Sequence, residues 1–282
     1  AENYPSWSPY NYVLNNPMNA IDPDGRDTWF IPGTAGGMDD RSPETISASE
    51  GFGSRYWFRK WQYYLGDTGN PYDLEWTGAN EDADRQAAAS RLANSIMSAY
   101  RNNRKNASFV INIVAHSHGG NIAMLALNII AGQVRTDKSL KDLKINRVVI
   151  AGTPQRPEYR LTPNAQRLIA NKVSVYSDLD NVQPHGGRDG DTRSQAIGVF
   201  FGSAKNAGRH HSNSGFTDLE MTWALKKSHN IDQFWLDSTR GPAVHGYLVT
   251  SENIMHAVSK QVSLNKDWGG IAAEKTVITI KY

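Results

Sequence analysis

A serine between an apolar strand pattern and an apolar helix pattern restricts the fold of this chain more than any other feature. Residues 108–115, SFVINIVA, are rich in β-branched residues and predict a buried strand, whereas residues 119–132, GGNIAMLALNIIAG, predict a buried helix. Ser117 stands in the turn between them, with Ala115 and Gly119 two residues to either side. Small residues there let strand and helix approach closely, so the stretch predicts a sharp turn that exposes the Ser117 hydroxyl at the carboxyl end of a strand.

Strand and helix patterns alternate along the rest of the chain. Strands are predicted at residues 27–33, 145–152 and 171–177, and a helix within residues 79–103. Such alternation is typical of a parallel sheet covered on both faces by helices, and 282 residues are enough to bury one large core of this kind. We therefore expect an α/β fold with a mainly parallel central sheet flanked by helices, and an edge strand at the final run KTVITIKY.

Composition argues against several other classes of protein. Thirty Lys and Arg against 28 Asp and Glu leave a net charge of +2, so no strong basic field indicates a nucleic-acid partner. The absence of cysteine excludes disulfides, thiolate metal sites and a cysteine nucleophile. We expect no cofactor. Asp178, Asp180, Asp189 and Asp191 offer the oxygen ligands that Ca²⁺ takes, but their spacing matches no EF-hand, so no metal is expected and a structural Ca²⁺ stays the alternative. The longest apolar run, Ile122 to Ala131, is too short to span a bilayer.

The first 27 residues differ from the rest of the chain. They are crowded with Pro, Asn, Asp and aromatic residues and show no helical period, which predicts a connector or an arm packed on the domain. The segment contains Tyr10-Asn11-Tyr12, Asn15-Asn16-Pro17 and Ile21-Asp22-Pro23-Asp24-Gly25. From about Tyr10 to Arg26 it resembles the end of an Rhs repeat-associated core, although Arg26 stands where that family usually has Leu.

This resemblance implies a division of the chain and a biological setting. Residues 1–27 are expected to be the end of the Rhs core, and residues 28–282 a polymorphic toxin domain. The segment carries no signal-peptide pattern, so the resemblance implies secretion and delivery into target cells as part of a larger Rhs protein. Its implied partners are the parent Rhs core and a cognate immunity protein.

The Ser117 turn and its surroundings resemble the lipases and esterases of the α/β-hydrolase family, over about Thr28 to Lys260. That family forms its oxyanion hole from the backbone N–H after the nucleophile and from an N–H in the loop after an earlier strand. The resemblance implies that Ser117 is the nucleophile and that the oxyanion donors are His118 and either Thr34 or Ala35.

The same resemblance implies the chain order serine, acid, histidine. The stretch from Ser177 to Gln183 resembles the family's loop with the pattern S-x-x-D-x-V-Q, which selects Asp180 over Asp178 as the acid. His245 lies in an expected late loop followed by a helix, as this family's base does, and His229 is the alternative. His116 and His118 flank the nucleophile and are expected to point away from its hydroxyl.

Two further segments leave alternatives open. Residues 186–215 mix Gly, Ser and charged residues around the apolar run from Ile197 to Phe201, which is consistent with a lid insertion or with a surface excursion. An aromatic cluster precedes the first long helix and is expected to pack in the core rather than to line an acyl pocket; its members are Trp57, Phe58, Trp61, Tyr63 and Tyr64.

The function expected from these resemblances is hydrolysis of lipid esters through a Ser117–Asp180–His245 triad. In a toxin the natural lipid ester is membrane phospholipid, so we expect phospholipase A activity at the surface of the target-cell membrane. Two other classes remain open, a nuclease of the Rhs type and a non-catalytic hydrolase-like binding module. A thioesterase, peptidase or transacylase would use the same triad.

Overall fold

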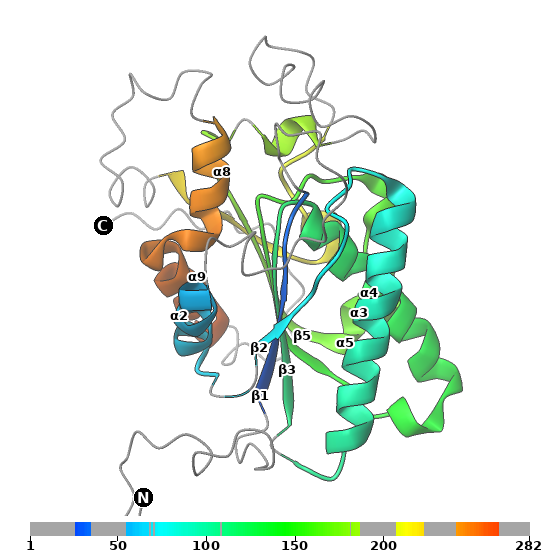
Figure 1. Cartoon of the computed structure of the whole chain (residues 1–282). Helices are drawn as coiled ribbons and strands as arrows, with labels where there is room; N and C mark the ends of the chain where they lie inside the picture. Colours follow the sequence, from blue (N-terminus) through cyan, green and yellow to red (C-terminus); the bar gives the residue numbers. More distant parts are fainter. Residues whose placement is uncertain are drawn as a thin grey trace, which may run out of the picture.

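The protein is built around a six-stranded sheet (Figure 1). A computed structural model describes residues 26–34, 55–67, 69, 71–107, 109–180, 182–186, 207–222 and 241–264. The strands are β1 (Arg26–Ile31), β2 (Pro71–Asp73), β3 (Val110–His116), β4 (Ile145–Ala151), β5 (Ile169–Tyr176) and β6 (Thr217–Glu220). They lie in the order β2-β1-β3-β4-β5-β6, and every neighbouring pair is parallel. The predicted parallel α/β architecture is therefore confirmed.

Helices cover both faces of this sheet (Figure 1). One face carries α3 (Asp82–Asn103), α4 (His118–Thr136) and α5 (Pro163–Leu168). The other face carries α2 (Arg55–Leu65), α8 (Gly241–Thr250) and α9 (Glu252–Leu264). Single 3-10 turns occur at Lys138–Leu140, Pro157–Tyr159, Gln183–His185 and Ser212–Ser214.

The two faces of the sheet form two separate apolar cores, because successive side chains of a strand point to opposite faces. In β1, Trp29 and Ile31 pack with the α3 and α4 side. Phe30 packs with the other side, where its ring stacks on Phe58 of α2 at 4.0 Å between centroids. Trp61 is also fully buried, as the aromatic cluster was expected to be, but Tyr63 of the same helix is 76% exposed.

The order of the strands fixes where a site can form. The chain leaves β1 for β2 on one side of it and then crosses to β3 on its other side. The strand order therefore reverses between β1 and β3, and parallel α/β sheets bind their ligands at the carboxyl ends of the strands at such a point. The segments that follow these two strands contain Gly33, Thr34 and Ser117.

Most predicted elements are present with small shifts at their ends. The strand predicted at 108–115 is β3, and the helix predicted within 79–103 is α3. The strand predicted at 27–33 is β1, which begins one residue earlier, at Arg26, and ends two residues earlier, at Ile31. The run KTVITIKY and most of the segment 186–215, including Phe200 and Phe201, lie outside the described residues. None of the helices in the described part of the chain is both long and apolar enough to cross a membrane.

Candidate active site

Ser117 occupies a strained turn between β3 and α4. Its backbone has φ 52° and ψ −132°, and among the described residues it is the one non-glycine residue with positive φ. Such a conformation costs on the order of 1–3 kcal/mol and persists where the surrounding structure enforces it, often at a functional site. Here the Ser117 amide donates to the Ala151 carbonyl at 2.8 Å, which extends the pairing of β3 with β4 into the turn.

Glycines after Ser117 let α4 start directly against the sheet. A Cβ on Gly119 would lie 2.5 Å from the Ile31 carbonyl oxygen and 2.6 Å from that of Pro32. A Cβ on Gly120 would lie 2.0 Å from Thr153 Oγ1. Neither contact is sterically possible, so the small residue that the sequence pattern requires after Ser117 is explained by the close approach of α4 to β1 and to the segment after β4.

His245 and Asp180 form a buried pair at the same edge of the sheet. His245 Nδ1 lies 2.7 Å from Asp180 Oδ2, and Asp180 is fully buried while His245 is 7% exposed. A carboxylate only accepts hydrogen bonds, so Nδ1 donates, and Nε2 keeps the lone pair that a general base needs. Nε2 is buried and makes no hydrogen bond to any described residue. The side chain of Asp178, by contrast, is 76% exposed.

Two links place His245 beside Ser117. The residue before Ser117 is His116, whose Nε2 lies 3.0 Å from the His245 carbonyl oxygen. The residue after the Ala151 that binds the Ser117 amide is Gly152, which has φ +60° and whose Cβ, if present, would lie 2.8 Å from His245 Cε1. The described structure thus brings together Ser117, Asp180 and His245. His229, the alternative base, lies outside the described residues.

One expectation about the base is wrong in its local structure. The sequence predicted a loop at His245 with a helix after it, but His245 lies inside α8, which begins at Gly241. The reason is that Pro242 is compatible with a first helical turn, and the buried side chains of Val244 and Leu248 are spaced to pack one helical face on the sheet.

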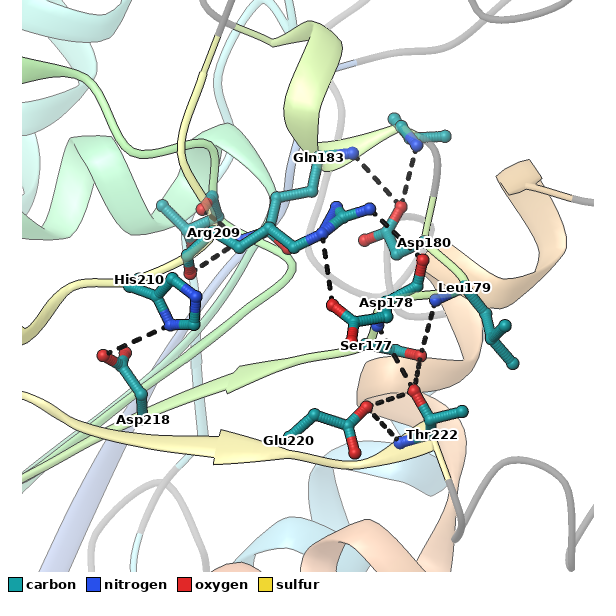
Figure 2. A network of polar contacts seen from close by, with 12 residues as sticks. Ser177, Asp178, Leu179, Asp180, Gln183, Arg209, His210, Asp218, Glu220 and Thr222 are labelled. Carbon is teal, nitrogen blue, oxygen red and sulfur yellow. Dashed lines mark hydrogen bonds and ion pairs between the residues drawn. The ribbon is translucent and has the colours of Figure 1, made fainter. Parts of the chain in front are cut away.

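The acid is held by its own loop (Figure 2). Asp180 Oδ1 accepts hydrogen bonds from the amides of Val182 at 2.8 Å and Gln183 at 3.1 Å, which leaves Oδ2 for His245. The buried Gln183 side chain donates to the Thr153 carbonyl at 2.7 Å and so ties this loop to the segment after β4. The sequence pattern included Gln183, and its role here is to position the loop that carries Asp180.

A second part of the network in Figure 2 joins the acid loop to β6. Ser177 Oγ lies 2.8 Å from Thr222 Oγ1, and the Asp178 amide donates to the same hydroxyl at 3.2 Å. Thr222 Oγ1 in turn donates to Glu220 of β6. Arg209 lies across the loop, with its guanidinium donating to the Asp178 carbonyl at 3.3 Å. These contacts anchor the start of the turn, and the bond from Gln183 to Thr153 anchors its end, so the position of the Asp180 carboxylate is restricted from both sides.

The segment after β1 lies over the nucleophile. A Cβ on Gly33 would be 2.5 Å from Ser117 Cβ and 3.2 Å from Ser117 Oγ. Thr34 follows, and its Oγ1 is buried without a hydrogen-bond partner among the described residues. His118 is the first residue of α4, so its amide lies at the positive end of a helix dipole. Two of the three predicted oxyanion residues are therefore next to Ser117, and Ala35 lies outside the described residues.

The sequence did not predict the contact of His116 with the base. It placed His116 away from the Ser117 hydroxyl, but gave no partner for its ring. That ring is packed on the His245 ring with 4.6 Å between centroids. Burial, and second the neighbouring His245 imidazole, lower the pKa of His116 from 6.5 to about 3, so it is neutral near pH 7. The one feature of the sequence that pointed to a role for His116 in the site is its position directly before Ser117.

No metal site accompanies these residues in the described part of the chain, which holds no group of three His, Asp or Glu side chains suited to one ion. The arrangement is one for nucleophilic catalysis: a hydroxyl on a strained turn, an imidazole beside it and a buried carboxylate behind the imidazole. The strand order, the turn after β3 and the chain order Ser117, Asp180, His245 are those of the α/β-hydrolase fold.

Comparisons with known proteins add little to this geometry. No protein-family model and no curated protein matches the chain. Among solved structures it is similar to a RedJ thioesterase from the prodiginine biosynthetic pathway in Streptomyces coelicolor, at 13% identity and a TM-score of 0.28, over 85% of this chain and 65% of that chain. A structure of RedJ with a PEG molecule in its active site is similar over 71% of this chain and 70% of that one, at 15% identity and a TM-score of 0.30.

Proposed function

We propose that this protein is a serine hydrolase of ester bonds, in which Ser117 is the nucleophile, His245 the general base and Asp180 the group that orients the base. The observation that carries the proposal is the buried 2.7 Å bond between His245 Nδ1 and Asp180 Oδ2 beside the strained Ser117 turn. A buried carboxylate that fixes the imidazole tautomer stabilises the imidazolium that forms when the base takes a proton.

The chemistry follows from the placement of these atoms. Ser117 Oγ attacks the ester carbonyl carbon while its proton passes to His245 Nε2. The carbonyl oxygen becomes an oxyanion, and the amides of His118 and Thr34 are the donors proposed to bind it. Collapse of the tetrahedral intermediate breaks the bond to the leaving alkoxide, which takes the proton from His245 Nε2. Water activated by the same imidazole then hydrolyses the acyl-enzyme and regenerates Ser117.

For the substrate we propose a lipid ester, with phospholipase A activity on membrane phospholipid. Support comes from the resemblance of the chain to lipases and from the resemblance of residues 10–26 to the end of an Rhs core. In that setting the domain is a toxin delivered into target cells as part of a larger Rhs protein. Its partners are then the phospholipid of the target-cell membrane surface, a cognate immunity protein and the parent Rhs core.

The test combines a serine probe with a lipid substrate. The purified protein is expected to react with a fluorophosphonate at Ser117 and to release fatty acid from phosphatidylglycerol–phosphatidylethanolamine vesicles. Ser117→Ala is expected to lose labelling, fatty-acid release and toxicity on expression in bacteria. Ser90→Ala, which changes an exposed serine on α3, is the matched control and keeps all three.

Each failure points to a different alternative. Fatty-acid release by the Ser117→Ala variant contradicts the catalytic assignment. Folded protein that the probe does not label is a non-catalytic module, and degradation of DNA or RNA that survives Ser117→Ala is a nuclease activity. If the probe labels Ser117 but no fatty acid is released, the protein is still a serine hydrolase and phospholipid is not its substrate. A panel of thioesters, peptides and short acyl esters then identifies the bond that is cleaved.

A further inference from the structure

We propose that His116 is a positioning residue that holds the main chain of the catalytic base against the nucleophile's strand. The inference rests on the proposed function, since it concerns the same Ser117–His245 pair. It adds a second fixed point for the base: Asp180 holds the imidazole at Nδ1, and His116 holds the peptide group of the same residue.

The direction of the His116 side chain follows from the strand. Val114 and His116 are two residues apart in β3 and therefore point to the same face of the sheet. Val114 belongs to the core formed with Val244 and Leu248 of α8. His116 therefore points toward the same helix at the carboxyl end of the strand, where it meets His245.

The hydrogen bond between them has one possible direction. A backbone carbonyl only accepts, so His116 Nε2 carries the proton and donates to the His245 oxygen at 3.0 Å. In an α-helix the carbonyl of residue 245 also faces the amide of Val249, four residues on, and its two lone pairs accommodate both donors. The contact thus attaches the helical turn that carries the base to the last residue before Ser117.

The rings reinforce this attachment. The imidazoles of His116 and His245 are 4.6 Å apart between centroids and tilted by 44°. On another side of the His245 ring, Gly152 leaves no room for a Cβ, which would lie 2.9 Å from Nδ1. With Asp180 behind Nδ1, His245 is restrained both at its ring and at its main chain.

A neutral imidazole suits this place better than a charged donor. During the reaction His245 becomes positively charged, and a lysine or arginine at position 116 would oppose that charge at close range. Burial lowers the pKa of His116 to about 3, with the His245 imidazole acting in the same direction and Asp180 in the opposite one. His116 therefore donates a hydrogen bond to the base residue without adding a like charge beside its ring.

Two substitutions separate the donor from the ring. His116→Phe keeps an aromatic ring and removes the N–H, whereas His116→Gln keeps an N–H donor of similar reach. We expect His116→Phe to lower kcat for p-nitrophenyl butyrate by about 10- to 100-fold, because displacement of a catalytic group by about 1 Å costs on the order of 100-fold. KM is expected to change less than about twofold, and His116→Gln to recover most of kcat. His256→Phe, on the exposed side of α9, is the matched control.

The outcomes distinguish this inference from the proposed function. If fluorophosphonate labels the wild type and not Ser117→Ala, while folded His116→Phe keeps the wild-type kcat, the positioning role is wrong and the hydrolase stands. The role is also wrong if the His116→Gln variant is folded and as slow as His116→Phe, or if His116→Phe raises KM alone. If the wild type is not labelled, both fail. Thermal unfolding establishes that each variant is folded, and His116→Asn replaces His116→Phe if the larger ring prevents folding.

Discussion

Gly33 lies so close to Ser117 that no larger residue fits between the segment after β1 and the nucleophile. A Cβ at this position would be 2.5 Å from Ser117 Cβ, so Gly33→Ala must displace either the serine or the proposed oxyanion segment. We expect the variant to lose at least about 100-fold in kcat/KM for an activated ester, because both groups have to be placed within about 1 Å. Stopped-flow or plate-reader assays of p-nitrophenyl butyrate measure the loss.

The matched control for Gly33→Ala is Gly132→Ala in α4. A Cβ on Gly132 would have no atom within 4 Å, and a glycine in a helix costs about 0.5–1 kcal/mol relative to alanine. Gly132→Ala is therefore expected to keep full activity and to raise the melting temperature. Equal activity in the two alanine variants would show that the segment after β1 does not border the reacting atoms.

Asp180 and Asp178 differ by two positions in sequence and are expected to differ greatly in function. Asp180→Asn keeps the shape of the fully buried side chain but allows the imidazole to adopt the wrong tautomer, so kcat is expected to fall by about 10⁴-fold. Asp178→Asn changes a side chain that is 76% exposed and is expected to keep kcat within about twofold. A comparable loss in both variants would contradict the assignment of the acid.

At the residue scale, the sequence predicts those site residues that short patterns mark. Ser117 and Gly119 stand in one turn, and Asp180 stands in a loop pattern that includes Gln183. The bond from His116 to the His245 carbonyl leaves no such mark, because it joins a side chain to a main-chain atom 129 positions away along the chain. Every residue carries a backbone carbonyl that can accept a hydrogen bond, so the type of the accepting residue does not reveal its donor. Tertiary packing decides which donor reaches it.

At the scale of elements, α2 supports the helix that carries the base. Phe58 stacks on Phe30 of β1 at 4.0 Å, and Trp61 Nε1 donates to the Val249 carbonyl of α8 at 2.9 Å. We expect Phe58→Ala to lower the free energy of unfolding by about 3–5 kcal/mol, the usual cost of truncating a fully packed phenylalanine. Urea unfolding monitored by tryptophan fluorescence measures it.

Tyr63 provides the control on the same helix. It is 76% exposed, so Tyr63→Ala is expected to change the free energy of unfolding by less than about 0.5 kcal/mol. If Phe58→Ala unfolds at the same urea concentration as the wild type, α2 is not part of the cooperative core. The comparison also tests whether the aromatic cluster packs, as the sequence favoured, because an acyl-pocket residue would affect KM more than stability.

The sequence predicts a helix or strand well where one pattern of apolar residues runs through the whole element. It predicts less well where contacts with distant segments decide which residues are buried. The β-branched run of β3 and the apolar period of α3 predict their own structure. Arg85 shows the limit: it is fully buried in α3, where it donates to the Tyr159 hydroxyl at 2.8 Å. A charged residue in a helix predicts an exposed face. Arg85 is buried instead, because it also donates to Asn80 just before the helix at 3.0 Å and because Tyr159 comes from a segment much later in the chain.

For the whole molecule, the sequence predicts a parallel sheet but not the order of its strands. Alternating strands and helices require parallel pairing, yet the position of β2 outside β1 depends on which way each crossover turns. That order places β1 directly beside β3, so the segments after these two strands meet and Gly33 lies against Ser117. The site therefore depends on the topology of the sheet as much as on its own motifs.

Buried neutral histidines make the stability of the whole fold sensitive to acid. Burial lowers the pKa of His116 from 6.5 to about 3, and burial also lowers the pKa of His211, which donates to the Thr153 carbonyl at 2.9 Å. In the unfolded chain both groups titrate near about 6.5. Below that pH the unfolded chain binds protons that the folded protein does not bind, so the free energy of unfolding falls as pH falls. For His116 this loss extends from about pH 6.5 to about pH 3, and His211 acts in the same direction.

The size of this effect distinguishes it from the general acid sensitivity of carboxylates. His116 is expected to lower the free energy of unfolding by up to about 1.4 kcal/mol for every pH unit within that range and to add no pH dependence above about pH 7.5, and His211 is expected to act in the same direction. Urea unfolding at about pH 7.5 and about pH 5.5 measures the slope, and the double variant of His116→Gln and His211→Gln, which cannot titrate at these positions, is expected to show a shallower one. A double variant with the wild-type slope would mean that neither imidazole is kept neutral by the fold, because the carboxylates that remain are the same in both proteins.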